Sequence, residues 1–374
     1  MRFSLEKLSS PLLRGYEMRI AVVHNEVAVH DAPDEKDVLL QVEAVSAALL
    51  SSGHEVIGLG CTLDLEDIKQ KLTQLKPQLV YNLVESLGGY GSLIHLFPFL
   101  LEALGLSYTG SDAEAIRLTS NKTAAKRRMC EADIPTPDWV EFQSLEKLRE
   151  DEKTNGKSRT WIIKSLWEHA SVGLDKNSLV QTRSASTLTA EMTKRVSSLG
   201  GACFAEEFIE GREFNLSILA GDKGPIVLPP AEICFEEFDP AKPRIVDYRA
   251  KWQEDSFEYR NTPRRFDFSD RDGSLIARLQ ELALRCWRVF GLRGYARVDF
   301  RVDGDNRPWI LEVNANPCLS PDAGFAAALS RARISFSEAV GSIIADSDRS
   351  RRELLMELDD MRKRLLLSPK ISSF

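Results

Sequence analysis

Four polar side chains near the end of the chain have the types and the spacing needed for a metal–phosphate site. Arg297 and Asp299 alternate with apolar residues in one stretch, and Glu312 and Asn314 alternate in the next. If these stretches pair as antiparallel strands, side-chain alternation lets the four polar groups converge. Carboxylate and amide oxygens suit Mg²⁺ that also holds nucleotide phosphates, and an arginine beside them can steady a transferring phosphoryl group.

The alternative interpretation of this hairpin is a half-solvated pair of strands whose polar residues simply face water. The intervening positions are apolar, which indicates that both faces of the hairpin are buried: Val298, Phe300, Ile310, Leu311 and Val313. We therefore favour the metal site over the solvated hairpin.

Two other stretches look like phosphate-binding loops but lack the required spacing. Asp151 occupies the position of the first glycine that a P-loop ending at Lys157-Ser158 would need. The glycines at 88, 89 and 91 do not complete a dinucleotide-binding motif. The sequence therefore disfavours a P-loop enzyme and a nicotinamide-dependent dehydrogenase.

Regular elements must position these side chains, and strands alternate with helices in the first third of the chain. Hydrophobic periodicity predicts strand, helix, strand, helix and strand at 18–23, 38–49, 55–59, 64–75 and 79–83. Such alternation is typical of a parallel sheet covered on both faces. We place a first α/β domain at 18–117.

Two further domains follow. The middle domain, 118–205, would begin with a capped helix near 120–132. The last domain, 206–346, would contain a long amphipathic helix near 274–290 and the polar hairpin.

The final segment, 347–374, has the pattern of an amphipathic helix. Its apolar residues form one helical stripe: Leu354, Leu358, Met361 and Leu365. We expect this stripe to dock on its own chain, with docking on a partner as the alternative.

Composition limits the function further. The chain has 374 residues, 43% hydrophobic and 28% charged, as in ordinary soluble globular proteins. Its net charge is −7 (49 basic minus 56 acidic residues) and it has no basic stripe, so we expect no nucleic-acid partner. No apolar run is long enough to span a membrane, and no secretory signal is evident, so we predict a cytoplasmic protein. Six scattered cysteines fit neither a disulfide framework nor a zinc site.

In this order, the motifs resemble those of the ATP-grasp superfamily, and within it the D-alanine:D-alanine ligase branch, over 18–346. The resemblance implies a three-domain α/β fold, with an N-terminal parallel-sheet domain before the two ATP-grasp domains. ATP would bind between the middle and last domains. Mg²⁺, as two ions or replaced by Mn²⁺, would be held by Asp299, Glu312 and Asn314.

The resemblance also assigns roles to individual residues. Those that would contact ATP at its phosphates, adenine or ribose are Lys122, Lys164, Ser171, Glu206, Glu207, Ile209 and Glu213. Arg297 matches the catalytic arginine, and Lys251 lies in the segment that closes over the substrate. His169 could be a general base, a substrate contact or a solvated loop histidine. Taken singly, the lysines could be surface charges and the glutamates polar strand positions.

The implied reaction is ATP-dependent ligation of a small carboxylate to an amine through an acyl phosphate, with backbone N–H groups near Cys318 and Leu319 stabilising the oxyanion. Ala170 and Trp252 replace hydroxyl-bearing residues of the family, and Asp322 lies where the acceptor carboxylate would bind. We therefore expect D-alanine plus D-alanine to be a poor substrate pair. The alternatives are a non-ligating ATP-binding regulatory protein and a carboxylate kinase. A homodimer remains open.

Overall fold

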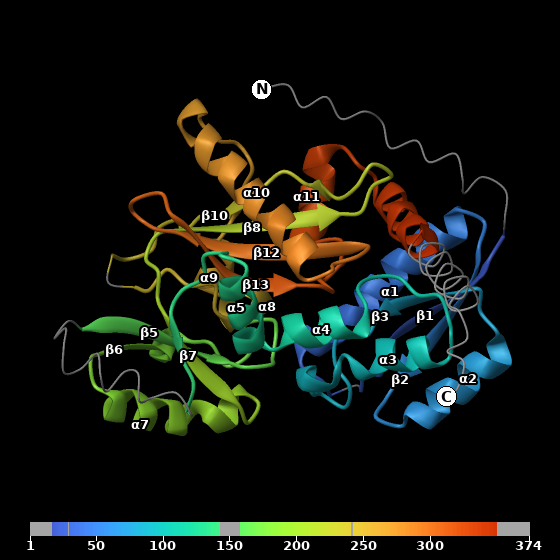
Figure 1. The fold of residues 1–374 in the computed structure, drawn as a ribbon, viewed down its shortest axis with the longest axis horizontal. Helices are drawn as coiled ribbons and strands as arrows, with labels where there is room; N and C mark the ends of the chain where they lie inside the picture. Colours follow the sequence, from blue (N-terminus) through green and yellow to red (C-terminus); the bar gives the residue numbers. More distant parts are fainter. Residues whose placement is uncertain (1–16, 29, 143–157, 241, 350–374) are drawn as a thin grey trace, which may run out of the picture.

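Three β-sheets form the framework of the protein, seen in the computed structural model in Figure 1. The structure describes residues 17–28, 30–142, 158–240 and 242–349. The predicted amphipathic stripe at 354–365 therefore lies outside the described residues. No helix in the described ranges is both long and apolar enough to cross a membrane.

The first sheet is parallel, with strand order β2-β1-β3, as the alternation of strands and helices predicts. Its elements are β1 (Arg19–Asn25), α1 (Pro33–Ser51), β2 (Glu55–Cys61), α2 (Leu65–Leu75) and β3 (Leu79–Leu83). Two shorter helices follow, α3 (Leu96–Ala103) and α4 (Ala113–Ser120). One face of the sheet packs against α2 and α3. The other face packs against α1 and shares its core with the C-terminal part of the chain.

The second sheet is small and antiparallel, with order β4-β7-β5-β6. It is preceded by α5 (Lys122–Glu131) and contains β4 (Trp139–Val140), β5 (Arg159–Ser165), β6 (Leu179–Thr182), α7 (Ala185–Arg195) and β7 (Cys203–Glu207). Helix α5 begins two residues later than predicted because Asn121 caps it, accepting a hydrogen bond from the Ala124 N–H. Helix α7 covers the sheet through one apolar cluster.

The third sheet has the order β11-β10-β8-β12-β13, with β9 paired to β8. Its elements are β8 (Arg212–Leu219), β9 (Ile226–Val227), β10 (Ala231–Ile233), α8 (Tyr248–Trp252), α9 (Phe257–Arg260), β11 (Arg264–Arg265), α10 (Gly273–Val289), β12 (Tyr295–Val302), β13 (Pro308–Asn314) and α11 (Gly324–Ala332). A further helix occupies 336–349. The predicted long helix is α10, whose apolar stripe packs on β8, β12 and β13.

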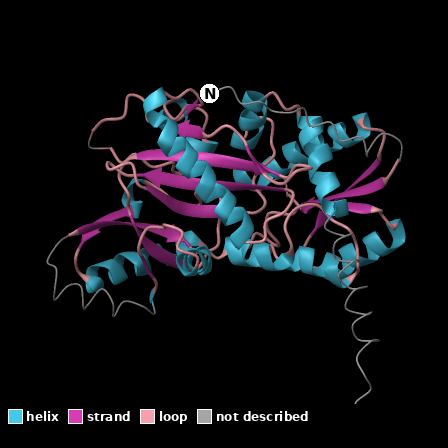
Figure 2. Cartoon of the chain, turned by 45° about the horizontal axis from the view of Figure 1, so that its top comes forward, coloured by secondary structure: helices cyan, strands magenta, loops and turns pink. Residues whose placement is uncertain are grey.

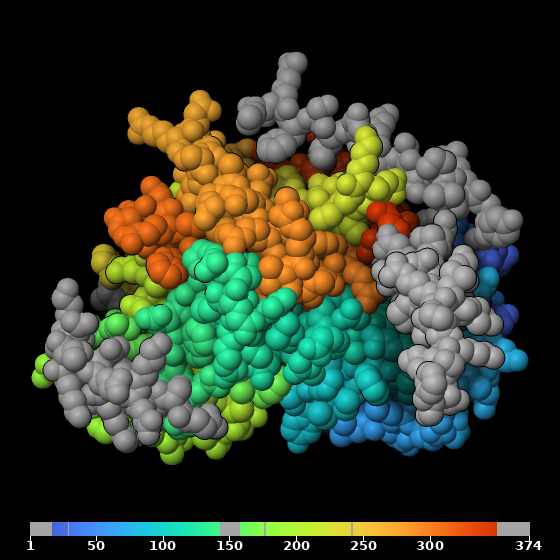
Figure 3. Space-filling model, viewed as in Figure 1, coloured from blue at the N-terminus to red at the C-terminus, as the bar shows by residue number. Residues whose placement is uncertain are grey.

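The three sheets are held together by shared cores. Figure 2 shows the strands in separate groups with helices packed on their outer sides. In Figure 3, the segment of α4 and α5 lies at the surface between the N-terminal part and the sheet covered by α10. Helices α4 and α5 both contact β13, so the polar hairpin lies where the parts of the chain meet.

Candidate active site

The polar hairpin forms as predicted. Strands β12 and β13 pair antiparallel, with Arg297 opposite Asn314 and Asp299 opposite Glu312. The Arg297 guanidinium donates from Nε and Nη2 to the two oxygens of Asp299, both at 2.8 Å, and lies 3.6 Å from Glu312 Oε1. The four polar side chains therefore converge, and the solvated-hairpin interpretation is wrong, because Asp299 is only 7% exposed.

Asn215 joins this cluster, although the sequence analysis missed it. It lies opposite Asp299 on the neighbouring strand β8, and its Nδ2 donates to Asp299 Oδ1 at 2.8 Å. Alternation along β8 puts Asn215 on the same face as Glu213, which was a candidate. Only the strand order, with β8 next to β12, reveals that this face meets the hairpin.

A second cluster of charges surrounds Glu206 at the end of β7. Its carboxylate lies between two lysines, with Lys126 Nζ at 2.7 Å and Lys164 Nζ at 2.5 Å. The Lys126 and Glu206 side chains are 0% and 1% exposed. Burial opposes the charged carboxylate, but the two lysines outweigh it and hold the pKa of Glu206 below its usual range. Lys126 was missed, although it lies four residues after Lys122 on α5.

Lys122 begins α5 and points toward the hairpin. Its ammonium donates to the Glu168 carbonyl at 2.6 Å, and burial lowers its pKa. Burial alone would raise the pKa of Glu312, but Lys122, His169, Lys251 and Arg297 together hold it far below its usual range. Glu312 is therefore a stable anion in a strongly positive environment.

The segment after β5 carries His169 and Ser171 into the site. Burial and then the charge of Lys122 lower the pKa of His169 to about 4, so its imidazole is neutral near pH 7. His169 Nδ1 is buried and has no hydrogen-bond partner among the described residues. Ser171 Oγ donates to the Val246 carbonyl at 2.8 Å, and Trp252 Nε1 donates to the Ala170 carbonyl at 3.0 Å. These bonds join the segment to α8 and to the loop that precedes it.

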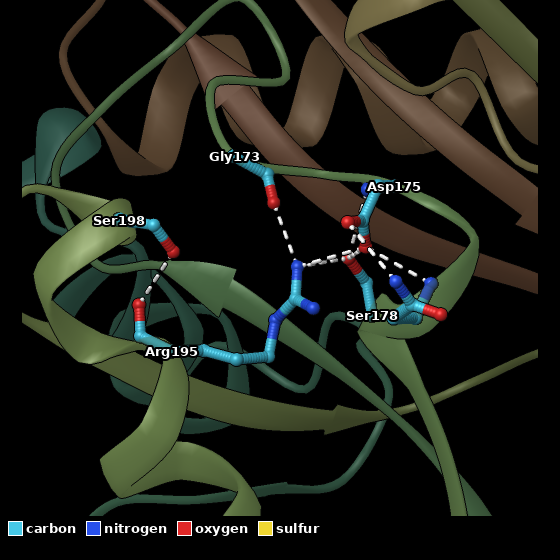
Figure 4. A network of polar contacts seen from close by, with 6 residues as sticks. Gly173, Asp175, Ser178, Arg195 and Ser198 are labelled. Atoms are coloured by element: carbon cyan, nitrogen blue, oxygen red, sulfur yellow. Dashed lines mark hydrogen bonds and ion pairs between the residues drawn. The ribbon is translucent and has the colours of Figure 1, made fainter.

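The far end of this segment is fastened to α7 (Figure 4). Arg195 Nη2 donates to the Gly173 carbonyl, to Asp175 Oδ1 and to Ser178 Oγ, at 2.8, 3.0 and 2.9 Å. Gly173 has φ of +71°, and a Cβ there would lie 2.7 Å from the Ser198 carbonyl oxygen. Only glycine fits this turn without displacing the segment.

Two cavities adjoin the hairpin. The smaller, about 100 Å³, is lined by all seven candidate ATP contacts: Lys122, Lys164, Ser171, Glu206, Glu207, Ile209 and Glu213. The larger, about 600 Å³, is lined by both hairpin strands and by the first α/β unit. Residues that line both cavities include His169, Lys251, Asp299 and Glu312. Asn314 and Arg297 line only the larger one. The two cavities therefore meet at the polar hairpin.

The larger cavity has an acidic wall supplied by Asp34, Asp37 and Glu85. Desolvation, followed by the charges of Asp37 and Asp34, raises the pKa of Glu85 to about 7. None of these three carboxylates forms an ion pair with any residue that the structure describes. Glu35, next to Asp34 in the sequence, accepts a hydrogen bond from the Ala32 N–H at the start of α1.

The expected oxyanion role of Leu319 conflicts with the structure. Its N–H donates to Gln41 Oε1 at 2.9 Å and is therefore not free to meet a reaction intermediate. The Cys318 thiol donates to Asp37 Oδ2 at 2.8 Å, and burial raises its pKa, so it is not a nucleophile. Lys251 was expected in a loop but lies in the short helix α8, where burial lowers its pKa.

The donor atoms at the hairpin are of the kind that Mg²⁺ prefers. Asp299 and Glu312 supply carboxylate oxygens, and Asn314 supplies an amide oxygen that also accepts a hydrogen bond from the Asn316 N–H. The described residues contain no cluster of three or more His, Cys, Asp or Glu side chains able to hold a metal alone. This donor set therefore fits a hard cation that takes its remaining ligands from phosphate and water.

Similarity in sequence to known proteins identifies the family of this chain. The model of the D-ala D-ala ligase C-terminus matches residues 129–345. The chain is 31% identical to the D-alanine–D-alanine ligase of Aquifex aeolicus, over 76% of this chain and 87% of the relative. It is 30% identical to that of Synechococcus sp. strain JA-3-3Ab, over 78% and 88%. The chain belongs to the D-alanine–D-alanine ligase family.

Solved structures of this ligase family have the same fold. The D-alanine–D-alanine ligase of Bacillus anthracis complexed with ATP aligns with a TM-score of 0.63 at 21% identity, over 90% of this chain and 99% of that chain. The VanG D-Ala:D-Ser ligase of Enterococcus faecalis aligns with a TM-score of 0.63 at 18% identity, over 89% and 100%. The predicted ATP-grasp fold is confirmed, and the family consists of ATP-dependent, ADP-forming ligases that make carbon–nitrogen bonds.

Proposed function

We propose that this protein is an ATP-dependent ligase that joins a carboxylate to an amine through an acyl phosphate. The observation that carries the proposal is the junction at the hairpin. A small cavity lined by lysines meets a larger cavity at Asp299 and Glu312, so a nucleotide phosphate and a substrate carboxylate can approach each other there. With domains divided at 118 and 206, ATP would bind between the second and third sheets, which supply Lys164 and Glu213 to the smaller cavity.

The first step is phosphoryl transfer. A carboxylate oxygen of the acid attacks the γ-phosphorus of ATP, the bond to the bridging oxygen breaks, and ADP leaves with that electron pair. Lys122, Lys164 and Arg297 neutralise the charge that develops on the phosphoryl oxygens. Mg²⁺, when held by Asp299, Glu312 and Asn314, would neutralise phosphate charge in the same place.

The second step forms the carbon–nitrogen bond. The amine attacks the acyl carbon, and phosphate leaves with one oxygen of the original carboxylate. The attacking nitrogen must lose a proton, and the neutral imidazole of His169, which lines both cavities, would accept it. Lys251, which lines both cavities, would stabilise the negative charge that forms on the reacting groups where the two substrates meet.

The remaining candidates hold the nucleotide. Glu206 forms ion pairs with Lys126 and Lys164, so its side chain would position Lys164 for the ATP phosphates. Adenine would lie against Glu207 and Ile209. Glu213, which forms an ion pair with Arg301 at 3.0 Å, would receive the ribose hydroxyls.

The substrates differ from D-alanine plus D-alanine under this proposal, although the named relatives are ligases for that pair. The cavity is about 600 Å³ and has an aromatic wall of Trp252, Tyr259 and Phe266. That volume and wall suit substrates bulkier than two alanines. The carboxylates of Asp34, Asp37 and Glu85, which form no ion pair with a described residue, suit the ammonium group of an amino acid or peptide.

An isotope experiment separates this mechanism from its rivals. The acid substrate is labelled with ¹⁸O in its carboxylate, and the released phosphate is analysed by mass spectrometry. Ligation through an acyl phosphate puts one labelled oxygen into phosphate only when the amine is present. A carboxylate kinase would accumulate the acyl phosphate without amine, and a regulatory protein would bind ATP and release no ADP.

A further inference from the structure

Arg264, on β11, is a guanidinium in the larger cavity that the proposed reaction does not use. It lines that cavity but not the smaller one. Its one hydrogen bond within the described ranges runs from Nη1 to the backbone carbonyl of Asp322, at 3.1 Å. No carboxylate of the described residues forms an ion pair with it. The neighbouring Arg265, by contrast, is paired with Glu232 and does not line the cavity.

The start of α11 leaves room for this side chain. Gly324 also lines the cavity, and a Cβ at this position would lie 3.5 Å from Arg264 Nε. A Cβ at position 324 would make an ordinary van der Waals contact with the guanidinium and cover part of it. The glycine keeps one side of Arg264 open to the cavity.

The surroundings of Arg264 favour an anion. Desolvation and then the charge of Arg297 lower the pKa of Arg264, and the charge of Asp322 opposes this shift. The Arg264 side chain is itself exposed, so the guanidinium can be reached from the cavity. Two guanidinium groups that repel each other across a cavity are both stabilised by an anion between them. The carboxylates of Asp34, Asp37, Glu85 and Asp322 also line this cavity and would repel that anion, so the anion is favoured only beside the two guanidinium groups.

We propose that Arg264 is the residue that binds the carboxylate carried by the amine substrate. This inference rests on the ligase function proposed above. The acid that is phosphorylated must lie at the hairpin, where the residues line both cavities. Arg264 lines only the larger cavity, so it meets the other substrate. Arginine suits this role because its planar fork can donate two parallel hydrogen bonds to a carboxylate.

This assignment changes the expectation drawn from Asp322. The sequence places an acidic residue where an acceptor carboxylate would bind, which argued for a cationic or amide group. The Asp322 side chain is exposed, and its backbone carbonyl orients Arg264 instead. The positive charge comes from a residue 58 positions earlier in the chain.

Steady-state kinetics with matched acceptors test the proposal. ADP release is measured with Mg²⁺-ATP over pairs of D- and L-amino acids, and each active acceptor is compared with its carboxamide. Replacing the carboxylate by the amide should raise the acceptor KM about 10- to 100-fold, because a pair of charge-assisted hydrogen bonds is lost. Arg264→Gln should raise the KM of the carboxylate acceptor to a similar extent. It should change the KM of the carboxamide acceptor little and leave the KM for ATP unchanged.

Two further variants complete the test. Arg264→Lys keeps the charge and should lose less acceptor affinity than Arg264→Gln. This difference would show that the weaker acceptor binding of Arg264→Gln comes from the lost charge and not from misfolding. Arg265→Gln, the matched control on the same strand, should leave every KM unchanged. Equal KM values for acid and amide acceptors, or an unchanged acceptor KM in Arg264→Gln, would overturn the inference while the ligase function stands. Absence of ADP release with every acid and amine pair would overturn both.

Discussion

Arg297 and Asp299, two residues apart on β12, are joined by two hydrogen bonds of 2.8 Å. This arrangement neutralises Asp299 and occupies both of its oxygens. Glu312, across the hairpin, has only the longer contact of 3.6 Å with the same arginine. Its carboxylate is therefore the more available of the two, and four surrounding cationic or basic groups keep it ionised.

The Glu312→Gln variant should keep its fold, because the side chains have nearly the same size, yet lose turnover roughly 100-fold at limiting Mg²⁺. The measurement is ADP release during a Mg²⁺ titration, with melting temperatures taken in parallel. Glu281→Gln, at an exposed ion pair on α10, is the control. Unchanged activity of Glu312→Gln at limiting Mg²⁺ would show that Glu312 is not a ligand.

Removing the Lys164 ammonium should weaken binding of Mg²⁺-ATP. Loss of one charge-assisted contact costs about 1.5 to 3 kcal/mol, or roughly a 10- to 150-fold higher Kd. Titration calorimetry of Lys164→Ala measures this, and Lys194→Ala, at an exposed ion pair on α7, should bind normally. Equal affinity in the two variants would remove Lys164 from the phosphate site.

The turn at Gly173 should tolerate no side chain. Gly173→Ala adds a Cβ 2.6 Å from Leu199 Cδ2, whereas Gly201→Ala, with a similar φ of +82°, meets nothing within 4 Å. In both variants the left-handed backbone should lower the free energy of unfolding by about 1 kcal/mol. In Gly173→Ala, overpacking should lower it by roughly a further 1 to 3 kcal/mol. Denaturant unfolding and ATP titration compare them. If both variants lose the same stability and affinity, the fastening of this segment to α7 is unimportant.

Glu85 should make the protein less stable as the pH rises. Its pKa is raised from 4.5 to about 7, so between these values the folded chain holds a proton that the unfolded chain has released. The stability from this proton is complete below pH 4.5 and is lost as the pH rises through about 7. Glu85→Gln should therefore gain melting temperature relative to the unmutated chain at pH 8 but not at pH 4.5. A constant difference across this range would contradict the assignment.

The control for that experiment is Glu66→Gln. Lys69 and Gln70 hydrogen-bond the exposed Glu66 carboxylate and lower its pKa. The variant should show no gain at high pH, because the native carboxylate is favoured there.

D-Alanine plus D-alanine should be a poor pair for this enzyme. The reason is local, because Ala170 contributes only a backbone carbonyl, and Trp252 Nε1 is used to bond it. Neither residue offers the substrate a hydroxyl group, and such polar contacts decide discrimination between small amino acids. Initial rates of D-alanyl-D-alanine formation measure this, with the best pair from the substrate screen as reference. Efficient formation of that dipeptide would refute the prediction.

The hairpin could be predicted from the sequence because alternation and pairing are local. Arg297, Asp299, Glu312 and Asn314 lie within two adjacent strands, so period-two spacing alone brings them together. The parallel first sheet followed from periodicity in the same way.

Asn215, Lys126 and Arg264 could not be predicted in this manner. Each acts through a partner that is distant in sequence: Asp299, Glu206 and Asp322. The order of the strands and the packing of α5 against them decide these contacts, and no local pattern encodes that order. The oxyanion role of Leu319 failed for the same reason, because Gln41 comes from the first α/β unit.

The most direct test of the ligase assignment is a measurement of ADP release by the purified protein with Mg²⁺-ATP, over amino acids, dipeptides and other small acids, each with and without an amine acceptor. The account predicts that ADP forms with at least one pair only when acid and amine are both present, and that ADP and the amide product appear in equal amounts. Saturating ADP release with an acid alone, or tight ATP binding without ADP release for any pair, would contradict it.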